Sequence, residues 1–136
     1  MGKGEIWVLG GDLETSRHIA KVLSGLVNPI RVIEDSFDFE ACFRGQSNET
    51  PPLLLLLDLS NKLSWQIINL ATQHGVDRRM TIVALVDAAS EHLVDRAYEA
   101  GAKTYLRKPL VFSDFVKRAK LLNLNVLIHP SRGETS

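Results

Sequence analysis

Short apolar runs alternate along this chain with longer stretches in which apolar residues recur every three or four positions. The short runs predict β-strands and the longer stretches predict amphipathic helices, because side chains repeat about every 2 residues in a strand and about every 3.6 in a helix. The expected strands are residues 5–9, 30–33, 53–57, 81–86 and 103–107. The expected helices are residues 13–27, 37–44, 63–74 and 91–100, and a last helix that Ser113 or Asp114 opens. This strict alternation predicts an α/β protein with an open, doubly wound, five-stranded parallel sheet.

The strongest strand signal is the run LLLLL at residues 53–57. It is apolar at every position, as expected of a central parallel strand that helices cover on both faces. A buried helix is the alternative for such a run, but the run is too short for one and Pro51 and Pro52 block its start. We therefore expect residues 53–57 at the centre of the sheet.

Several residues mark where helices begin and end. Ser36 and Ser90 stand directly before two of the expected helices, where a hydroxyl can accept a hydrogen bond from the first helical turn. Gly101 follows the second of these helices, and the Asn28-Pro29 step ends the first helix of the chain.

Length and composition limit the classes of protein to which this chain can belong. The 136 residues suit one domain, which we place at residues 1–124, with a tail or the start of a linker at 125–136. The 16 Lys and Arg residues balance 16 Asp and Glu residues, so the chain lacks the basic excess that direct nucleic-acid binding requires. The single cysteine, Cys42, excludes an internal disulfide. No apolar run is long enough for a membrane span or signal peptide, so we expect a cytoplasmic protein.

The candidate functional residues lie at the ends of four of the expected strands, at the edge where doubly wound sheets bind ligands. They are Gly10, Gly11 and Asp12 after the first strand, Asp58 after the third, Val86 and Asp87 at the end of the fourth, and Lys108 and Pro109 after the fifth.

Two motifs, LLLLLD at residues 53–58 and GAKTYLRKP at residues 101–109, resemble those of the receiver domains of two-component response regulators. The resemblance covers residues 5–124 and implies a flavodoxin-like fold. It implies that Asp58 accepts a phosphoryl group from a histidine kinase and that Lys108 pairs with the phosphate.

The resemblance also implies roles for neighbouring residues. Asp12, Asp58 and the backbone carbonyl of Ser60 match the positions that bind Mg²⁺, and the bond between Lys108 and Pro109 matches one that is usually cis. Tyr105 matches the aromatic residue that changes position on activation, and Val86 stands at the position of the Ser or Thr coupled to it.

The chain departs from the receiver pattern at two of these places. Gly10 and Gly11 replace acidic residues, so we expect Mg²⁺ binding to be weak or lost, because Mg²⁺ is normally held by more than one carboxylate. Val86 has no hydroxyl, which removes a charge-assisted hydrogen bond to phosphate worth roughly 1.5–3 kcal/mol. Asp87 either adds repulsion beside Asp58 or supplies a replacement metal ligand, and the sequence leaves both open.

Each candidate residue also has a purely structural interpretation. An ion pair without chemistry accounts equally well for Asp58 and Lys108, and Asp12 is equally suited to cap the helix that it precedes. Tyr105 also fits a half-buried strand position. A dinucleotide site at Gly10 and Gly11, with Glu34 or Asp35 binding the ribose, is disfavoured because the G-x-G-x-x-G spacing is absent.

Two surfaces are candidates for protein contacts. Receiver domains typically communicate through the face formed by helix four, strand five and helix five, and an ordinary solvated face is the alternative here. The residues expected on it carry both signs of charge and are Glu91, Asp95, Tyr98, Arg107, Lys117, Arg118 and Lys120. The apolar triplet Val126, Leu127 and Ile128 could pack on the sheet or core, form a dimer contact, or begin a linker.

The sequence therefore predicts a non-enzymatic, receiver-like signalling module that acts through protein contacts, with weak or absent phosphorylation. The expected partners are a histidine kinase or another signalling protein, or a second copy of the chain. The alternative hypothesis is a working phosphoacceptor that is phosphorylated on Asp58, with Asp12 and Asp87 completing an unorthodox Mg²⁺ site.

Overall fold

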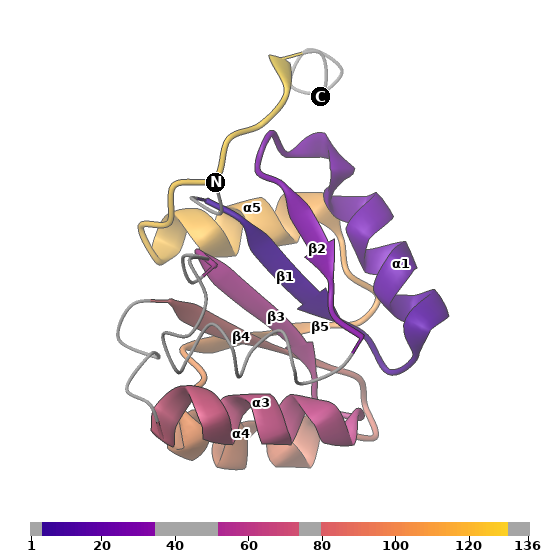
Figure 1. Cartoon of the computed structure of the whole chain (residues 1–136), viewed down its shortest axis with the longest axis vertical. Coiled ribbons are helices and arrows are strands. Elements are labelled where there is room, and N and C mark those ends of the chain that lie inside the picture. The colour runs from indigo at the N-terminus through magenta and orange to yellow at the C-terminus, as the bar shows by residue number, and fades with distance from the viewer. Residues whose placement is uncertain (1–3, 35–51, 74–79, 131–136) are drawn as a thin grey trace.

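Five parallel strands form one sheet at the centre of the molecule (Figure 1). The computed structural model describes residues 4–34, 52–73 and 80–130. Its strands are β1 (Ile6–Leu9), β2 (Ile30–Val32), β3 (Leu54–Asp58), β4 (Thr81–Val86) and β5 (Thr104–Arg107). They lie in the order β2-β1-β3-β4-β5, so the order reverses between β1 and β3. This arrangement confirms the predicted doubly wound α/β fold.

Helices cover both faces of the sheet (Figure 1). They are α1 (Leu13–Val22), α3 (Lys62–Gln73), α4 (Val94–Ala100) and α5 (Phe112–Leu121), with single 3₁₀ turns at Leu23–Gly25 and Glu91–Leu93. Helices α1 and α5 lie on one face, and α3 and α4 lie on the other.

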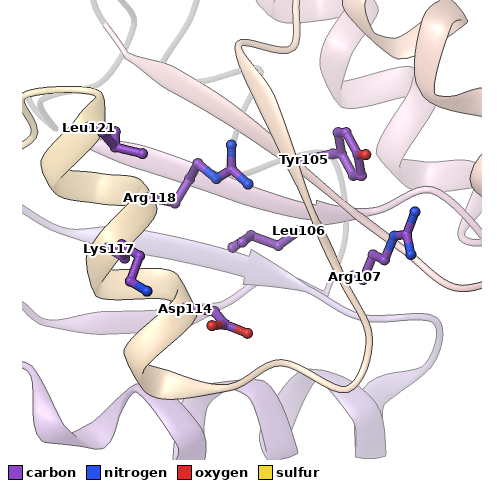
Figure 2. A pocket seen from close by; sticks show the side chains of 7 residues that line it. All are labelled: Tyr105, Leu106, Arg107, Asp114, Lys117, Arg118 and Leu121. Carbon is purple, nitrogen blue, oxygen red and sulfur yellow. The ribbon is translucent and has the colours of Figure 1, made fainter.

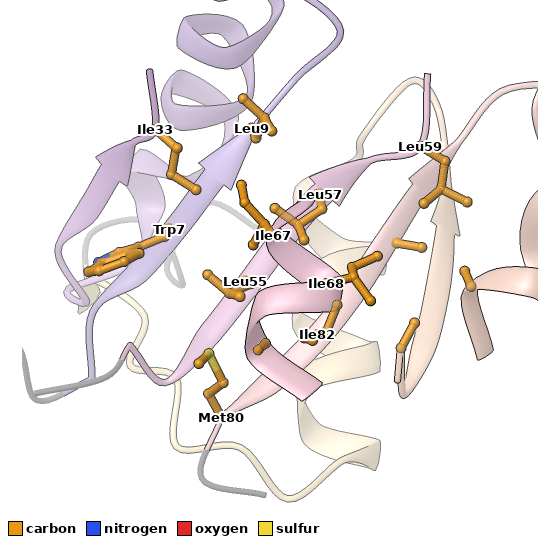
Figure 3. Packing of buried hydrophobic residues seen from close by; sticks show 14 of the residues in the cluster. Trp7, Leu9, Ile33, Leu55, Leu57, Leu59, Ile67, Ile68, Met80 and Ile82 are labelled. Carbon is orange, nitrogen blue, oxygen red and sulfur yellow. The ribbon is translucent and has the colours of Figure 1, made fainter. Parts of the chain in front are cut away.

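The apolar core has two layers, because successive strand residues point to opposite faces of the sheet. On the α3 and α4 side, Leu55 and Leu57 pack with Ile67 and Ile68 of α3 (Figure 3). On the α1 and α5 side, the alternate strand residues pack against buried residues of these two helices. The leucines of β3 are all buried, which confirms that this strand is central.

The predicted end of the first helix and the predicted start of the last helix were wrong. The first helix ends at Val22 and not at residue 27, because a 3₁₀ turn follows and directs Leu23 and Leu26 into the core. The last helix opens before Ser113, since the carbonyl of Val111 already accepts the first helical hydrogen bond.

The helix predicted at residues 91–100 begins instead as a 3₁₀ turn and becomes α-helical at Val94. Ser90 precedes it without a side-chain capping bond. Gly101 ends it, with a φ of 126° that favours glycine. The helix expected at residues 37–44, with Ser36 as its cap, lies outside the described residues.

The segment after α5 returns to the edge of the sheet at which the parallel strands begin (Figure 1). Leu26 and Ile128 form an antiparallel bridge, and the amide of Val27 donates to the carbonyl of Leu127 at 2.6 Å. The side chain of Asn28, only 7% exposed, donates to the carbonyls of Gly4 and Asn125 and accepts from the amide of Leu127. Of the three alternatives for the apolar triplet, packing against the core is the one seen, since Val126 and Ile128 lie against it. None of the helices in the described ranges is long and apolar enough to cross a membrane.

Candidate functional site

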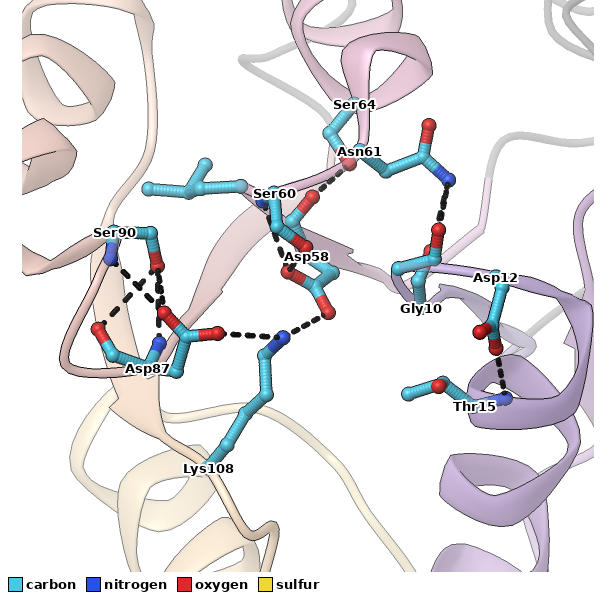
Figure 4. A network of polar contacts seen from close by, with 12 residues as sticks. Gly10, Asp12, Thr15, Asp58, Ser60, Asn61, Ser64, Asp87, Ser90 and Lys108 are labelled. Atoms are coloured by element: carbon cyan, nitrogen blue, oxygen red, sulfur yellow. Dashed lines mark hydrogen bonds and ion pairs between the residues drawn. The ribbon is translucent and has the colours of Figure 1, made fainter.

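Polar side chains meet at the carboxyl ends of β1, β3, β4 and β5 (Figure 4). Asp58, the last residue of β3, lies at their centre. Because β3 runs between β1 and β4 and is covered on both faces, its last side chain is 0% exposed. A carboxylate in such a place requires polar partners, since burial of an unpaired charge is costly.

The chain itself supplies those partners. The Oδ1 atom of Asp58 accepts hydrogen bonds from the backbone amide of Ser60 at 2.9 Å and from its hydroxyl at 2.7 Å. The Oδ2 atom accepts no regular hydrogen bond from the described residues, but it forms an ion pair with Nζ of Lys108 at 2.5 Å. The backbone carbonyl of Asp58 accepts from the hydroxyl of Ser64 at 2.5 Å, which joins the end of β3 to α3. Both carboxylate oxygens are therefore engaged by donors of the chain.

Lys108 contacts two carboxylates. Its ammonium lies between Asp58 and Asp87, with the Oδ2 atom of Asp87 at 3.5 Å (Figure 4). Its side chain is 22% exposed. This partial burial acts to lower the pKa of Lys108, but the interaction with Asp58 and a further one with Asp87 outweigh it and raise the pKa above its usual value. The peptide bond between Lys108 and Pro109 is cis.

Asp87 is held in a tight turn by Ser90. Its Oδ1 atom accepts from the amide of Ser90 at 2.9 Å and from the hydroxyl at 3.1 Å, and its own amide donates to that hydroxyl at 3.0 Å. These bonds, followed by the charge of Lys108, lower the pKa of Asp87. The lysine ammonium thus separates the carboxylates of Asp87 and Asp58, an arrangement that the sequence left open.

Asp12 caps α1. Its exposed side chain accepts a hydrogen bond from the amide of Thr15 at 2.7 Å, and this bond is the main cause of the lowered pKa of Asp12. The capping role that the sequence allowed is therefore present.

The two glycines before Asp12 differ in the space around them. A Cβ atom at Gly10 would lie 2.7 Å from the backbone nitrogen of Ser16, so a side chain does not fit there. A Cβ atom at Gly11 would lie 3.1 Å from Oγ of Ser60 and 3.5 Å from Oδ2 of Asp58. A side chain at position 11 would thus lie beside the Asp58 carboxylate, and the chain has only a hydrogen atom there.

The described residues do not match the usual demands of a divalent cation. Within residues 4–34, 52–73 and 80–130, no three His, Cys, Asp or Glu side chains are grouped so that they could hold a metal ion. Mg²⁺ needs free oxygen ligands in a near-octahedral arrangement. In this site the carboxylate of Asp58 already accepts a hydrogen bond from the hydroxyl of Ser60 and forms an ion pair with Lys108, so its oxygens are not free ligands.

Asn61 is also part of the site, a role that the sequence motifs did not predict. Its Nδ2 atom donates to the carbonyl of Gly10 at 2.9 Å, and its Oδ1 atom accepts from the amide of Leu63 at 2.9 Å. The second bond caps α3, and asparagine directly before a helix is a recognisable sequence signal for that role. The first bond links the loops that follow β1 and β3 (Figure 4).

Val86 and Tyr105 lie near the site but make no polar side-chain contact with Asp58. Val86 is 0% exposed and packs in the core layer beside α3 and α4, while its carbonyl accepts from the amide of Lys108 at 2.7 Å. Tyr105 is half-buried in β5 and packs edge-on against Tyr98, with ring centroids 6.4 Å apart.

A shallow hollow lies between β5 and α5 (Figure 2). It is lined by Tyr105, Leu106, Arg107, Asp114, Lys117, Arg118 and Leu121. Arg107 pairs with Glu91, and Nη1 of Arg118 donates to the hydroxyl of Thr104 at 3.2 Å. The β5 strand is at the edge of the sheet, so the hollow is open to an approaching molecule.

Similar solved structures are response regulators and their receiver domains. The receiver domain of Francisella response regulator 1452 is 16% identical over 88% of this chain and 95% of its own, with a TM-score of 0.66. The Mn²⁺-bound form of response regulator Rcp1 is 24% identical over 88% of this chain and 91% of its own, with a TM-score of 0.62.

A longer protein also matches. NtrX from Brucella abortus is 18% identical over 86% of this chain, with a TM-score of 0.67, and the match spans only 26% of NtrX. No protein-family model matches the sequence, and the search of curated proteins finds no match. The structural matches confirm that the chain has the fold of a response regulator receiver domain, as the two sequence motifs predicted.

Proposed function

From the receiver-domain fold, we propose that this chain is a signalling module of the two-component type that acts by binding other proteins. We further propose that Asp58 accepts phosphoryl groups weakly or not at all. The observation that carries the proposal is the state of the Asp58 carboxylate, which is 0% exposed and whose Oδ1 atom already accepts two hydrogen bonds from Ser60.

Phosphoryl transfer to a carboxylate needs an oxygen free to approach phosphorus and cations that neutralise the phosphoryl oxygens. The Oδ1 atom of Asp58 already accepts two hydrogen bonds from Ser60. One resident cation, Lys108, is shared with Asp87. The expected ligands of Mg²⁺ are Asp12, Asp58 and the Ser60 carbonyl. The carboxylate of Asp12 already accepts the capping hydrogen bond of α1, and Gly11 has no side chain that could bind the ion. We therefore expect weak Mg²⁺ binding at most.

Val86 also weakens any response to a phosphate. Its apolar side chain offers no hydroxyl to a phosphoryl oxygen and lies in the core. A ligand shifts a conformational equilibrium only through contacts that differ between the two states. We therefore expect no coupling from Asp58 through Val86 to Tyr105.

The binding surface in this proposal is the face of α4, β5 and α5, and the partner is a histidine kinase or another signalling protein. The face combines the edge strand β5, the hollow of Figure 2 and charges of both signs. Such a mixture favours specific pairing with a complementary protein surface. A second copy of the chain is the other partner that this face would fit.

A working phosphoacceptor is the second candidate function. The feature that favours it is the pairing of Asp58, at the end of β3, with Lys108 after β5. In that case Asp58 would receive the phosphoryl group from a histidine kinase, and Lys108 would pair with the product.

Intact-mass measurement separates the two candidates. The protein is incubated with acetyl phosphate and Mg²⁺, beside Asp58→Asn as the control and a receiver domain known to react. We expect no mass gain in this chain. Gain of one phosphoryl group that Asp58→Asn abolishes would overturn the proposal and establish the second candidate.

The surface is tested separately. Arg107→Glu and Lys117→Glu reverse two charges on the proposed face. The control, Lys21→Glu, reverses the charge of an exposed residue of α1, a helix that is not part of that face. We expect the first two to weaken complex formation with the cognate kinase, and self-association if it occurs. Unchanged binding in both would exclude this face.

A further inference from the structure

Asn61 connects two loops that are distant in the sequence. Its Nδ2 atom donates to the carbonyl of Gly10 at 2.9 Å and lies 3.5 Å from that of Gly11. Its backbone amide donates to the carbonyl of Asp58 at 3.1 Å. One residue thereby fixes the loop after β1 relative to the buried carboxylate at the end of β3 (Figure 4).

The contacts around Asp58 have one feature in common. Side-chain and backbone donors hold the Asp58 carboxylate and the Gly10 carbonyl: the side-chain amide of Asn61, the hydroxyl and amide of Ser60, and the ammonium of Lys108. Their acceptors are oxygen atoms, namely the carboxylate of Asp58 and the carbonyl of Gly10. Oxygens of this kind are what a hard divalent cation binds, so these donors hold the groups that a cation would need.

We infer that Asn61 is a positioning residue that holds the loop after β1 to the Asp58 site and so replaces a divalent cation as the link between them. Ser60 and Lys108 complete the arrangement by neutralising Asp58. On this inference the site should keep its geometry without metal. The inference rests on the proposed function only in taking Asp58 as a phosphoacceptor position of weak or lost activity.

The role of Asn61 is separable from its capping of α3, because different atoms serve each. The Oδ1 atom caps the helix through Leu63, and the Nδ2 atom makes the link to Gly10. Asn61→Asp keeps the capping oxygen and replaces the donor by a second carboxylate oxygen. That oxygen would face the Gly10 carbonyl, so two acceptors would oppose each other, and a cation between them would relieve the repulsion.

The experiment compares thermal unfolding in MgCl₂ with unfolding in KCl of equal ionic strength. Wild-type protein should have the same Tm in both salts. Asn61→Asp should have a lower Tm in KCl and regain most of the loss in MgCl₂. Asn69→Asp, which adds the same charge at an exposed position of α3, should be insensitive to the choice of salt.

Amide spectra of the labelled proteins give a local readout that a general loss of stability would not produce. In Asn61→Asp, the signals of Gly10 and Gly11 should move on addition of Mg²⁺, and in wild type they should not. Equal movement in the wild type would overturn the inference, because the site would then accept metal with Asn61 in place. A Tm of Asn61→Asp that equals wild type in KCl, or that Mg²⁺ does not raise, would overturn it as well.

A further variant covers the case in which Asn61→Asp does not fold in either salt. Asn61→Ser retains a capping oxygen but is too short to reach Gly10 as the amide does. It should shift the Gly10 amide signal without any response to Mg²⁺, and an unmoved Gly10 signal would refute the link. Phosphorylation of wild type would refute the proposed function alone, whereas metal-sensitive Gly10 signals in an unphosphorylated wild type would refute this inference alone.

Discussion

The pairing of Lys108 with Asp58 predicts a large stability loss when the ammonium is removed. Lys108→Met keeps most of the side-chain length and leaves the buried carboxylate without its cation. Removing one partner of a buried ion pair costs about 3–5 kcal/mol. The Oδ1 atom keeps its two bonds from Ser60, and Lys108 is 22% exposed, so we expect the lower end, about 3 kcal/mol.

Urea unfolding at neutral pH measures this loss. With a slope of about 2 kcal/mol per molar urea, a loss of about 3 kcal/mol lowers the midpoint by about 1.5 M. Lys103→Met is the matched control, because Lys103 is exposed just before β5 and its loss should have little effect.

A double variant shows whether the loss arises from the unpaired carboxylate. Asp58→Asn combined with Lys108→Met removes both charges and should recover most of the stability that Lys108→Met loses. Equal midpoints for Lys108→Met and Lys103→Met would refute the reasoning. A double variant no more stable than Lys108→Met would refute it too, since the loss would then come from packing.

Three further predictions concern pH, the loop after β1 and the tail. The pKa of Lys108 is raised on folding, so the stability that its charge provides is fully present below its unfolded pKa near 10.5 and is lost as pH rises through the higher folded value. As the pH is raised from neutral, the urea-midpoint difference between wild type and Lys108→Met should therefore shrink only above pH 10.5. Gly10→Ala should cost about 1–3 kcal/mol in urea unfolding, because its Cβ would lie 2.7 Å from helix backbone, whereas Gly11→Ala faces mainly a movable hydroxyl and should cost less. Asn28→Ala should cost about 1–3 kcal/mol and speed hydrogen exchange at the Val27 amide, and unchanged exchange there would contradict the tail pairing.

The fold followed from the sequence because its signals are local. Each strand is a short apolar run, and the all-leucine run of β3 indicates burial on both faces whatever the rest of the chain does. The helix limits were less accurate, because tertiary contacts set them. The first helix stops where Leu23 and Leu26 turn into the core, a contact that periodicity alone does not describe.

The contacts of the candidate site also differ in how far the sequence predicted them. Asp58 and Lys108 were identifiable because each directly follows a segment that the sequence predicts as a strand, and parallel strands bring their carboxyl ends together. The link from Asn61 to Gly10 was not, because it depends on β1 and β3 being neighbours and on the path of two loops. The contact between Lys108 and Asp87 likewise requires the turn that Ser90 forms.

The central proposal is that the chain's own donors complete the Asp58 site, which responds weakly or not at all to a metal ion and to a phosphoryl group. The most direct test is an amide spectrum of the labelled protein before and after addition of Mg²⁺ with beryllofluoride, which mimics a phosphoryl group on a carboxylate. We predict unchanged signals for Asp58, Ser60 and Lys108. A new, saturable set of signals at these residues, absent in Asp58→Asn, would contradict the claim.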